Sequence, residues 1–395
     1  MTGAMRYILL KVKRFCGFIT GFVFFLSGLV KLMDPVGAGL VMDEYFSFLH
    51  IGFLSFSAKA AGVAFALAET IIGAALVTGV WRKLSALCAL VLQSFFTFLT
   101  LLLVIFNPEM DCGCFGEAIH LTHMQTFIKN IILLALLLIY YIPGGDIGIP
   151  RKKKYISFSV VTASVLAFTI YSLLYIPLID FTAYKAGAEL EAGAEINADQ
   201  MYESVFTYEK DGKQETFTLG HLPDSTWTFV SVDTRLKKGY EETLTGLSFY
   251  DPQTEEYMDT LAIEGKIMII SVYDPKIREG KWARIGTFIS NAAEAGFRPI
   301  LLTTSTEDIP ENLIGSTYIS DYKTLISLNR SNGGVTYFHN GQLVRKWAAI
   351  KIPDKAELDI ITRTDATEIS IEQDNKGSLV FQGFLLYVFA VMLLM

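Results

Sequence analysis

The sequence predicts an α-helical membrane bundle of six helices that carries an α/β domain outside the bilayer. Of the 395 residues, 52% are hydrophobic, which is more than an ordinary soluble domain contains. The apolar residues gather in six runs, most of them close to the 20 residues that a helix needs to cross a bilayer. Between the fifth and sixth runs the chain is polar at first and then alternates buried-strand and amphipathic-helix patterns.

Three basic clusters set the predicted orientation. Residues 1–14, 81–83 and 151–154 carry Lys and Arg beside apolar runs, and such loops stay in the cytoplasm. Segments 34–57, 107–125 and 177–377 then lie outside, so we expect a bacterial inner membrane protein with a cytoplasmic N-terminus and a periplasmic soluble domain. The expected helices are 15–33, 58–80, 84–106, 126–142, 155–176 and 379–395.

The expected domains follow from these boundaries. They are a four-helix membrane domain (1–145), a fifth helix with a basic linker (146–178), a β-rich outer region (179–260), an α/β outer domain (261–375) and a C-terminal membrane helix (376–395). Segment 34–57 is aromatic and amphipathic, which favours a helix at the membrane interface. In the β-rich region, Asp211-Gly212 lies between two alternating stretches and predicts a hairpin turn. A further strand is expected near 226–232.

Residues 262–350 show the order strand, helix, strand, helix, hairpin. The strands are expected at 266–273, 298–303, 334–339 and 342–347, with helices at 282–295 and 321–329 and a tight turn at Asn340-Gly341. This order is that of a thioredoxin-like fold. The chain has no Cys after Cys114, and residues 274–281 read DPKIREGK where such a fold would carry Cys-x-x-Cys. The outer domain cannot do dithiol chemistry by itself.

Cys112 and Cys114 are the main candidates for chemistry. They are two of only four cysteines and lie in the outer loop 107–125. Gly113 and Gly116 let the backbone bend there. A pair spaced by one residue can form a strained disulfide or exchange with a partner through a mixed disulfide. The neighbouring Asp111 would raise a thiol pKa.

Three interpretations of the pair stay open. It is a redox-active or substrate-exchanging pair, a structural disulfide that bends the loop, or part of a metal site. The metal interpretation rests on His120 and His123, since thiolate with imidazole suits Zn or Cu, although the spacing is not a common zinc pattern.

Charges inside the bundle are the second set of candidates, because they are costly in a membrane. Glu69 lies midway along the second predicted helix, and Lys31 and Asp34 close the first. Lys31 can snorkel to the interface; alternatively, a Glu69–Lys31 pair would satisfy both charges. Cys16 and Cys88 fall inside helices and are expected to act as small hydrophobes, with an electron relay to Cys112 and Cys114 as the alternative.

These motifs resemble a known family. FFLSGLVKL with Asp34-Pro35, Glu69 followed by Gly73, and the stretch Asp111 to Gly116, which includes Phe115, are similar to the DoxX-like superfamily, and its MauE branch of methylamine utilisation in particular. The resemblance covers about residues 15–142 and implies a four-helix membrane bundle that supports disulfide handling of exported proteins. The family is loosely similar to quinone-linked thiol oxidases. The cofactor and the electron acceptor stay unknown at this point; a quinone in the bundle is one option, although no residue pattern of its own marks a site. Residues 332–341 resemble the strand and turn after the cis-proline of thioredoxin-like domains, with Gly333 in the proline's place. With both the proline and the cysteines missing, this resemblance implies a binding or scaffold role.

Two hypotheses about function follow. In the first, the Cys112/Cys114 pair exchanges electrons with an exported protein that docks on the outer domain. In the second, the protein is a non-enzymatic assembly or binding module and the pair is a fixed staple. The expected partners are the lipid bilayer and an exported protein; the acidic balance, a net charge of -7, argues against nucleic acid, which requires a basic face.

Overall fold

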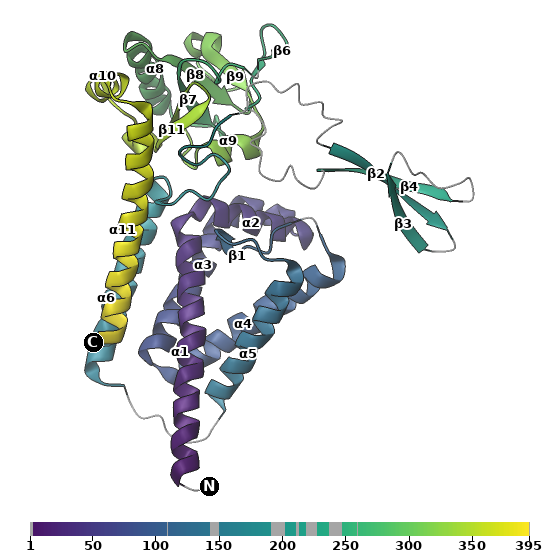
Figure 1. Ribbon diagram of the computed structural model, residues 1–395, viewed down its shortest axis with the longest axis vertical. Coiled ribbons are helices and arrows are strands. Elements are labelled where there is room, and N and C mark those ends of the chain that lie inside the picture. Colours follow the sequence, from purple (N-terminus) through teal and green to yellow (C-terminus); the bar gives the residue numbers. More distant parts are fainter. Residues whose placement is uncertain are drawn as a thin grey trace. The chain divides into compact units, whose positions relative to one another are not determined.

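The computed structural model describes residues 3–108, 110–142, 150–190, 202–210, 213–218, 227–236, 247–258 and 260–394. The chain divides into two compact units. Unit 1 comprises Met1–Thr182 and Glu372–Met395, and unit 2 comprises Ala183–Ile371. Unit 1 is helical and unit 2 contains the sheets (Figure 1).

Six helices of the described chain are long and apolar enough to cross a membrane. This confirms the six predicted spans. The first and last helices begin earlier than predicted, at Gly3 instead of residue 15 and at Ala366 instead of residue 379. The helices are α1 (Gly3–Met33), α3 (Ala58–Thr78, extended by the 3-10 turn η1, Gly52–Ser57), α4 (Arg82–Phe106), α5 (His123–Tyr141), α6 (Lys152–Leu174) and α11 (Ala366–Leu394).

Small residues bring α1 and α3 into close contact. A Cβ on Gly28 would lie 2.2 Å from Thr70 Oγ1, and one on Gly73 would lie 2.4 Å from the backbone nitrogen of Phe25. Inside a bilayer, helices associate through such close van der Waals packing, because lipid offers no hydrophobic force to drive them together. The two helices are thereby fixed side by side, with Lys31 of α1 facing Glu69 of α3.

The segment between α1 and α3 forms the predicted helix. α2 (Pro35–Phe48) begins at Asp34, whose carboxylate accepts a hydrogen bond from the backbone N–H of Gly37 at 3.0 Å. Pro35 occupies the first helical position, where its missing N–H causes no loss. In Figure 1, α2 lies next to β1 (Cys114–Glu117), a short extended segment that contacts both α1 and α2.

A mixed sheet of seven strands forms the core of unit 2, in the order β11-β10-β7-β8-β9-β5-β6. β7 and β8 are parallel and joined through α8, whereas β10 is antiparallel to both β7 and β11. The strands are β5 (Tyr250–Asp251), β6 (Glu256–Tyr257), β7 (Lys266–Val272), β8 (Arg298–Thr303), β9 (Thr317–Ile319), β10 (Gly334–His339) and β11 (Gln342–Trp347). The helices are α8 (Glu279–Glu294), α9 (Tyr322–Leu328) and α10 (Lys355–Arg363), with short 3-10 turns η3 (Glu311–Ser316) and η4 (Ala349–Lys351).

The predicted strands and helices of this region are confirmed within a few residues. Asn340 and Gly341 have φ angles of +49° and +81°, as a tight hairpin turn requires. One boundary differs: β5 and β6, which the sequence places in the β-rich region, extend the seven-stranded sheet. They do so because Tyr250 of β5 pairs with Ile319 of β9. The thioredoxin-like assignment stays a prediction.

A separate sheet of three strands has the order β3-β2-β4, all antiparallel. Its strands are β2 (Tyr202–Lys210), β3 (Lys213–Thr218) and β4 (Thr228–Leu236). The predicted turn at Asp211-Gly212 lies outside the described residues, but Lys210 pairs with Lys213 on either side of it, so the flanking strands form the expected hairpin.

Candidate functional site

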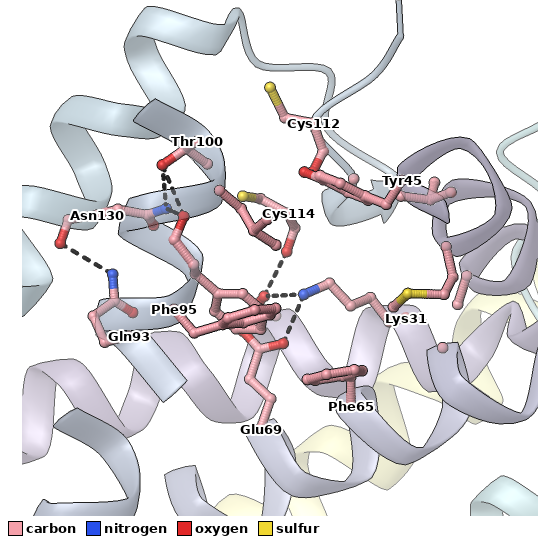
Figure 2. Close-up of a pocket in the computed structure, with 18 of the residues that line it drawn as sticks. Lys31, Tyr45, Phe65, Glu69, Gln93, Phe95, Thr100, Cys112, Cys114 and Asn130 are labelled. Atoms are coloured by element: carbon pink, nitrogen blue, oxygen red, sulfur yellow. Dashed lines mark hydrogen bonds and ion pairs between the residues drawn. The ribbon is translucent and has the colours of Figure 1, made fainter. Parts of the chain in front are cut away.

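A cavity of about 320 Å³ lies within unit 1, among α1 to α5 and the loop that carries the cysteines (Figure 2). Its walls are mainly apolar and aromatic. The rings of Phe65 and Phe95 are stacked at 5.9 Å with an interplanar angle of 6°. The polar or reactive residues that line it are Ser27, Lys31, Tyr45, Glu69, Gln93, Thr100, Cys112, Cys114, Lys129 and Asn130.

The Lys31–Glu69 pair predicted from the sequence is confirmed. Lys31 Nζ lies 2.6 Å from Glu69 Oε2, and both side chains are largely buried. Lys31 also donates to Ser27 Oγ at 3.3 Å, and Ser27 Oγ donates to the carbonyl oxygen of Cys114 at 2.5 Å. A continuous chain of hydrogen bonds therefore joins the ion pair in the bundle to the backbone of the cysteine loop (Figure 2).

A second helix holds the other cysteine's backbone. The hydroxyl of Tyr45 on α2 donates to the carbonyl oxygen of Cys112 at 3.0 Å, and burial raises the pKa of Tyr45, which keeps it a donor. Gly113 has a φ of +60°, and a Cβ there would lie 2.2 Å from Val41 Cγ1. Gly116 has a φ of +57°. The two glycines are therefore needed for the bend of the loop, as predicted from the sequence.

Cys112 and His123 are in direct contact. Cys112 Sγ lies 2.9 Å from His123 Nδ1, and His123 Nε2 lies 3.0 Å from the carbonyl oxygen of Pro108. Cys112 is only 5% exposed. The pKa of its thiol is raised, mainly by burial, and the charges of Cys114 and Asp111 raise it further. The Thr126 hydroxyl and the charge of Lys129 act in the opposite direction and lower it.

Cys114 is half-buried and faces the cavity, and no disulfide joins it to Cys112. Figure 2 shows the two sulfur atoms pointing in different directions. The neighbouring Phe115 ring lies 5.0 Å from Lys129 Nζ. Both cysteines thus line one cavity, and the sulfur of Cys112 lies against His123.

The remaining candidates lie apart from this centre. Asp34 caps α2 and does not line the cavity. Asp111 pairs with His120 at 3.2 Å on the exposed side of the loop. His120 and His123 have different partners, Asp111 and Cys112. The described residues contain no group of three or more His, Cys, Asp or Glu side chains that could hold a metal ion. Cys16 is buried in an apolar cluster with Leu137, as expected of a small hydrophobe.

Several residues of the site were missed by the sequence analysis. Gln93 Nε2 donates to the carbonyl oxygen of Asn130 at 3.0 Å, and Asn130 Nδ2 donates to Thr100 Oγ1 at 3.2 Å. Polar side chains within membrane helices are a signal that could have found Gln93 and Asn130. Ser27 and Tyr45 have no such signal, since a serine or an interfacial tyrosine is ordinary in a membrane protein.

A helical bundle of membrane-spanning length with this cavity defines a multi-pass membrane protein. The family model for methylamine utilisation protein MauE matches residues 6–143. Together with the apolar helices, this match supports a MauE-type membrane protein. A model for a domain of unknown function matches residues 202–239, which span the three-stranded sheet. Neither the curated proteins nor the solved structures contain a match to the chain.

Proposed function

We propose that this protein is a membrane thiol–disulfide exchange protein whose Cys112/Cys114 pair reacts with exported partners. The observation that carries the proposal is the geometry of the loop: two unbonded cysteines line one cavity, and the sulfur of one of them, Cys112, contacts a histidine. A purely structural disulfide needs neither a cavity nor a base. The hydrogen bonds from Ser27 and Tyr45 hold both cysteine carbonyls, which fixes the loop from two helices.

The exchange balances within the pair. When a partner disulfide is attacked by one thiolate, its S–S bond breaks and a mixed disulfide forms, while one partner sulfur leaves as a thiol. Attack by the second cysteine then forms the Cys112–Cys114 bond and releases the other partner thiol. The reverse sequence oxidises a partner dithiol and leaves the pair reduced.

The compartment supports this proposal. Basic residues flank the membrane helices at 1–14, 81–83 and 151–154, which favours a cytoplasmic N-terminus in a bacterial inner membrane and an outer face for the loop. On that face disulfides persist. Unit 2 lacks cysteines in its whole sequence, so its proposed role is to dock the partner, on a thioredoxin-like scaffold whose strand order β11-β10-β7-β8 fits such a fold.

A lipid-soluble quinone is the proposed electron acceptor, and the cavity residues fit one. The stacked Phe65 and Phe95 rings offer a flat apolar wall. An ammonium has three donors. Among the described residues, two donors of Lys31 go to Glu69 and Ser27, which leaves the third for a carbonyl oxygen of the quinone. When bound, a quinone would accept two electrons and two protons from the thiol pair.

The test is the oxidation state of the two thiols in cells. Acid quenching followed by alkylation with a mass-tagged maleimide should find both the dithiol and the disulfide, in a ratio that shifts with added reductant or oxidant. Cys112→Ser should trap an exported protein in a complex that reductant releases. Cys88→Ser is the matched control, because this cysteine does not line the cavity.

The opposite outcome would favour the assembly module. A pair that never changes state and traps nothing would rule out exchange. If replacing both cysteines then only lowered the stability of the bundle, the pair would be a structural staple.

A further inference from the structure

We propose that His123 is the base for Cys112, and that Cys112 is the resolving thiol that attacks Cys114 once Cys114 carries a partner. This inference deepens the proposed function and rests on it. It starts from the geometry at the beginning of α5, where His123 lies between the Cys112 sulfur and the Pro108 carbonyl.

The tautomer of His123 is set by its second contact. The carbonyl oxygen of Pro108 can only accept a hydrogen bond, so the Nε2 atom at 3.0 Å from it carries the proton. In a neutral imidazole the other nitrogen then has a free lone pair. That nitrogen, Nδ1, lies 2.9 Å from Cys112 Sγ, so it accepts from the thiol and is placed to take its proton.

The surroundings of Cys112 explain why a base is needed. The charged and titratable groups that act on the thiol are Asp111 and Cys114 from the loop and Lys129 from α5. Burial outweighs these, so the thiol is neutral at rest. The N-terminus of α5 favours a thiolate once the proton has moved. Nucleophilic attack therefore requires transfer to His123 in the same step.

Exposure divides the roles of the two cysteines. Cys112 is 5% exposed and its sulfur is covered by His123, whereas Cys114 is half-buried and faces the cavity. A bulky partner sulfur reaches Cys114 more easily. The buried, base-assisted thiol is suited to the intramolecular step, which needs no access from outside.

The step balances as follows. The Cys112 thiol proton moves to His123 Nδ1, and the thiolate attacks Cys114 Sγ in a Cys114–S–S–R mixed disulfide. The S–S bond between Cys114 Sγ and the R sulfur breaks, the leaving R thiolate takes the proton from His123, and R–SH departs. The pair is oxidised to a disulfide and the R sulfur is reduced to a thiol.

Release of the coloured thiolate from Ellman's reagent tests the assignment on the full chain, in a Cys16→Ser/Cys88→Ser background. The reduced pair should release it in two phases, the first for modification of Cys114 and the second for attack by Cys112. His123→Ala should leave the first phase unchanged and slow the second at least about tenfold, since general-base assistance contributes roughly 10²–10⁴-fold. The substitution should also shift the pH at which the second phase reaches half of its maximal rate to a higher value. Cys112→Ser should show the first phase alone.

His120→Ala is the matched control, because this histidine is three residues away and contacts Asp111 and not a thiol. It should leave both phases unchanged. His123→Gln retains a donor for the Pro108 carbonyl but has no basic nitrogen, so it should melt like wild type and yet remain slow. Added imidazole should partly restore the His123→Ala rate.

Three results would overturn the inference. They are an equal effect of the two histidine variants, a slowed first phase in His123→Ala, and peptide mapping that finds the reagent first on Cys112. The outcome is separable from that of the proposed function, because this assay needs no partner. A pair that resolves through His123 in vitro but traps nothing in cells would refute the exchange function alone.

Discussion

The Lys31–Glu69 pair gives the sharpest prediction about stability. Glu69 is the more deeply buried partner, with a side-chain exposure of 6% against 15% for Lys31. Removing one partner of a buried pair leaves an uncompensated charge and costs about 3–5 kcal/mol. Lys31 lies in the last turn of α1 and can swing its ammonium to the interface. A carboxylate cannot, so Lys31→Met should destabilise the bundle more than Glu69→Leu.

The double variant should recover most of this loss. With both charges gone, no desolvated ion remains, and replacing a buried pair by apolar residues is often neutral. The assay is the melting temperature of the detergent-solubilised full chain, measured by size-exclusion after heating, at about 2–4 °C per kcal/mol. Lys129→Met is the control, since it removes a cation–π contact worth about 0.5–1 kcal/mol and a charge near Cys112, and leaves the buried Lys31–Glu69 pair intact. Strictly additive losses in the double variant would refute the reasoning.

Three further predictions concern other parts of the chain. Gly113→Ala should lower the melting temperature, because its Cβ would lie 2.2 Å from Val41 Cγ1; Val41→Ala should restore the space but leave about 1–2 kcal/mol of left-handed strain, and no rescue at all would contradict the steric argument. Asn329, which is fully buried, donates to the carbonyls of β10 and β11, so Asn329→Ala should cost roughly 1–3 kcal/mol for each carbonyl left unpaired. Faster hydrogen exchange in both strands would show it, and unchanged protection would count against it. The hydrogen bond and charge of Lys355 lower the pKa of Glu294. The stability that the pair contributes to the folded state is therefore fully present above the ordinary carboxyl pKa and is lost as the pH falls through the lowered value. The difference in melting temperature between wild type and Glu294→Gln should shrink in acid. A difference that grows in acid would contradict the predicted direction of the pH dependence.

Much of the fold was predictable because it depends on local patterns. An apolar run of bilayer length must form a helix, since the backbone has no other way to satisfy its polar groups in lipid, and six such helices are present. The strands from Lys266 to Trp347 were recognisable from their continuous apolar runs and the Asn340-Gly341 turn. The early start of α11 at Ala366 was not, because the residues before 379 are polar. The first turn of this helix is fixed by tertiary packing, since Ala366 and Ile369 are buried in the core of unit 2.

The sequence by itself determined the cysteine pair, the glycines that bend its loop and the presence of two opposite charges in the predicted helices. These follow from composition and position, because a charge within an apolar run is costly in lipid and two of only four cysteines are one residue apart. Only the tertiary structure decided which groups meet. His123 contacts Cys112 while His120, three residues away, contacts Asp111, because a turn into α5 directs the two rings differently. Likewise Ser27 and Tyr45 reach the loop from α1 and α2, across sequence separations over which no local pattern carries information.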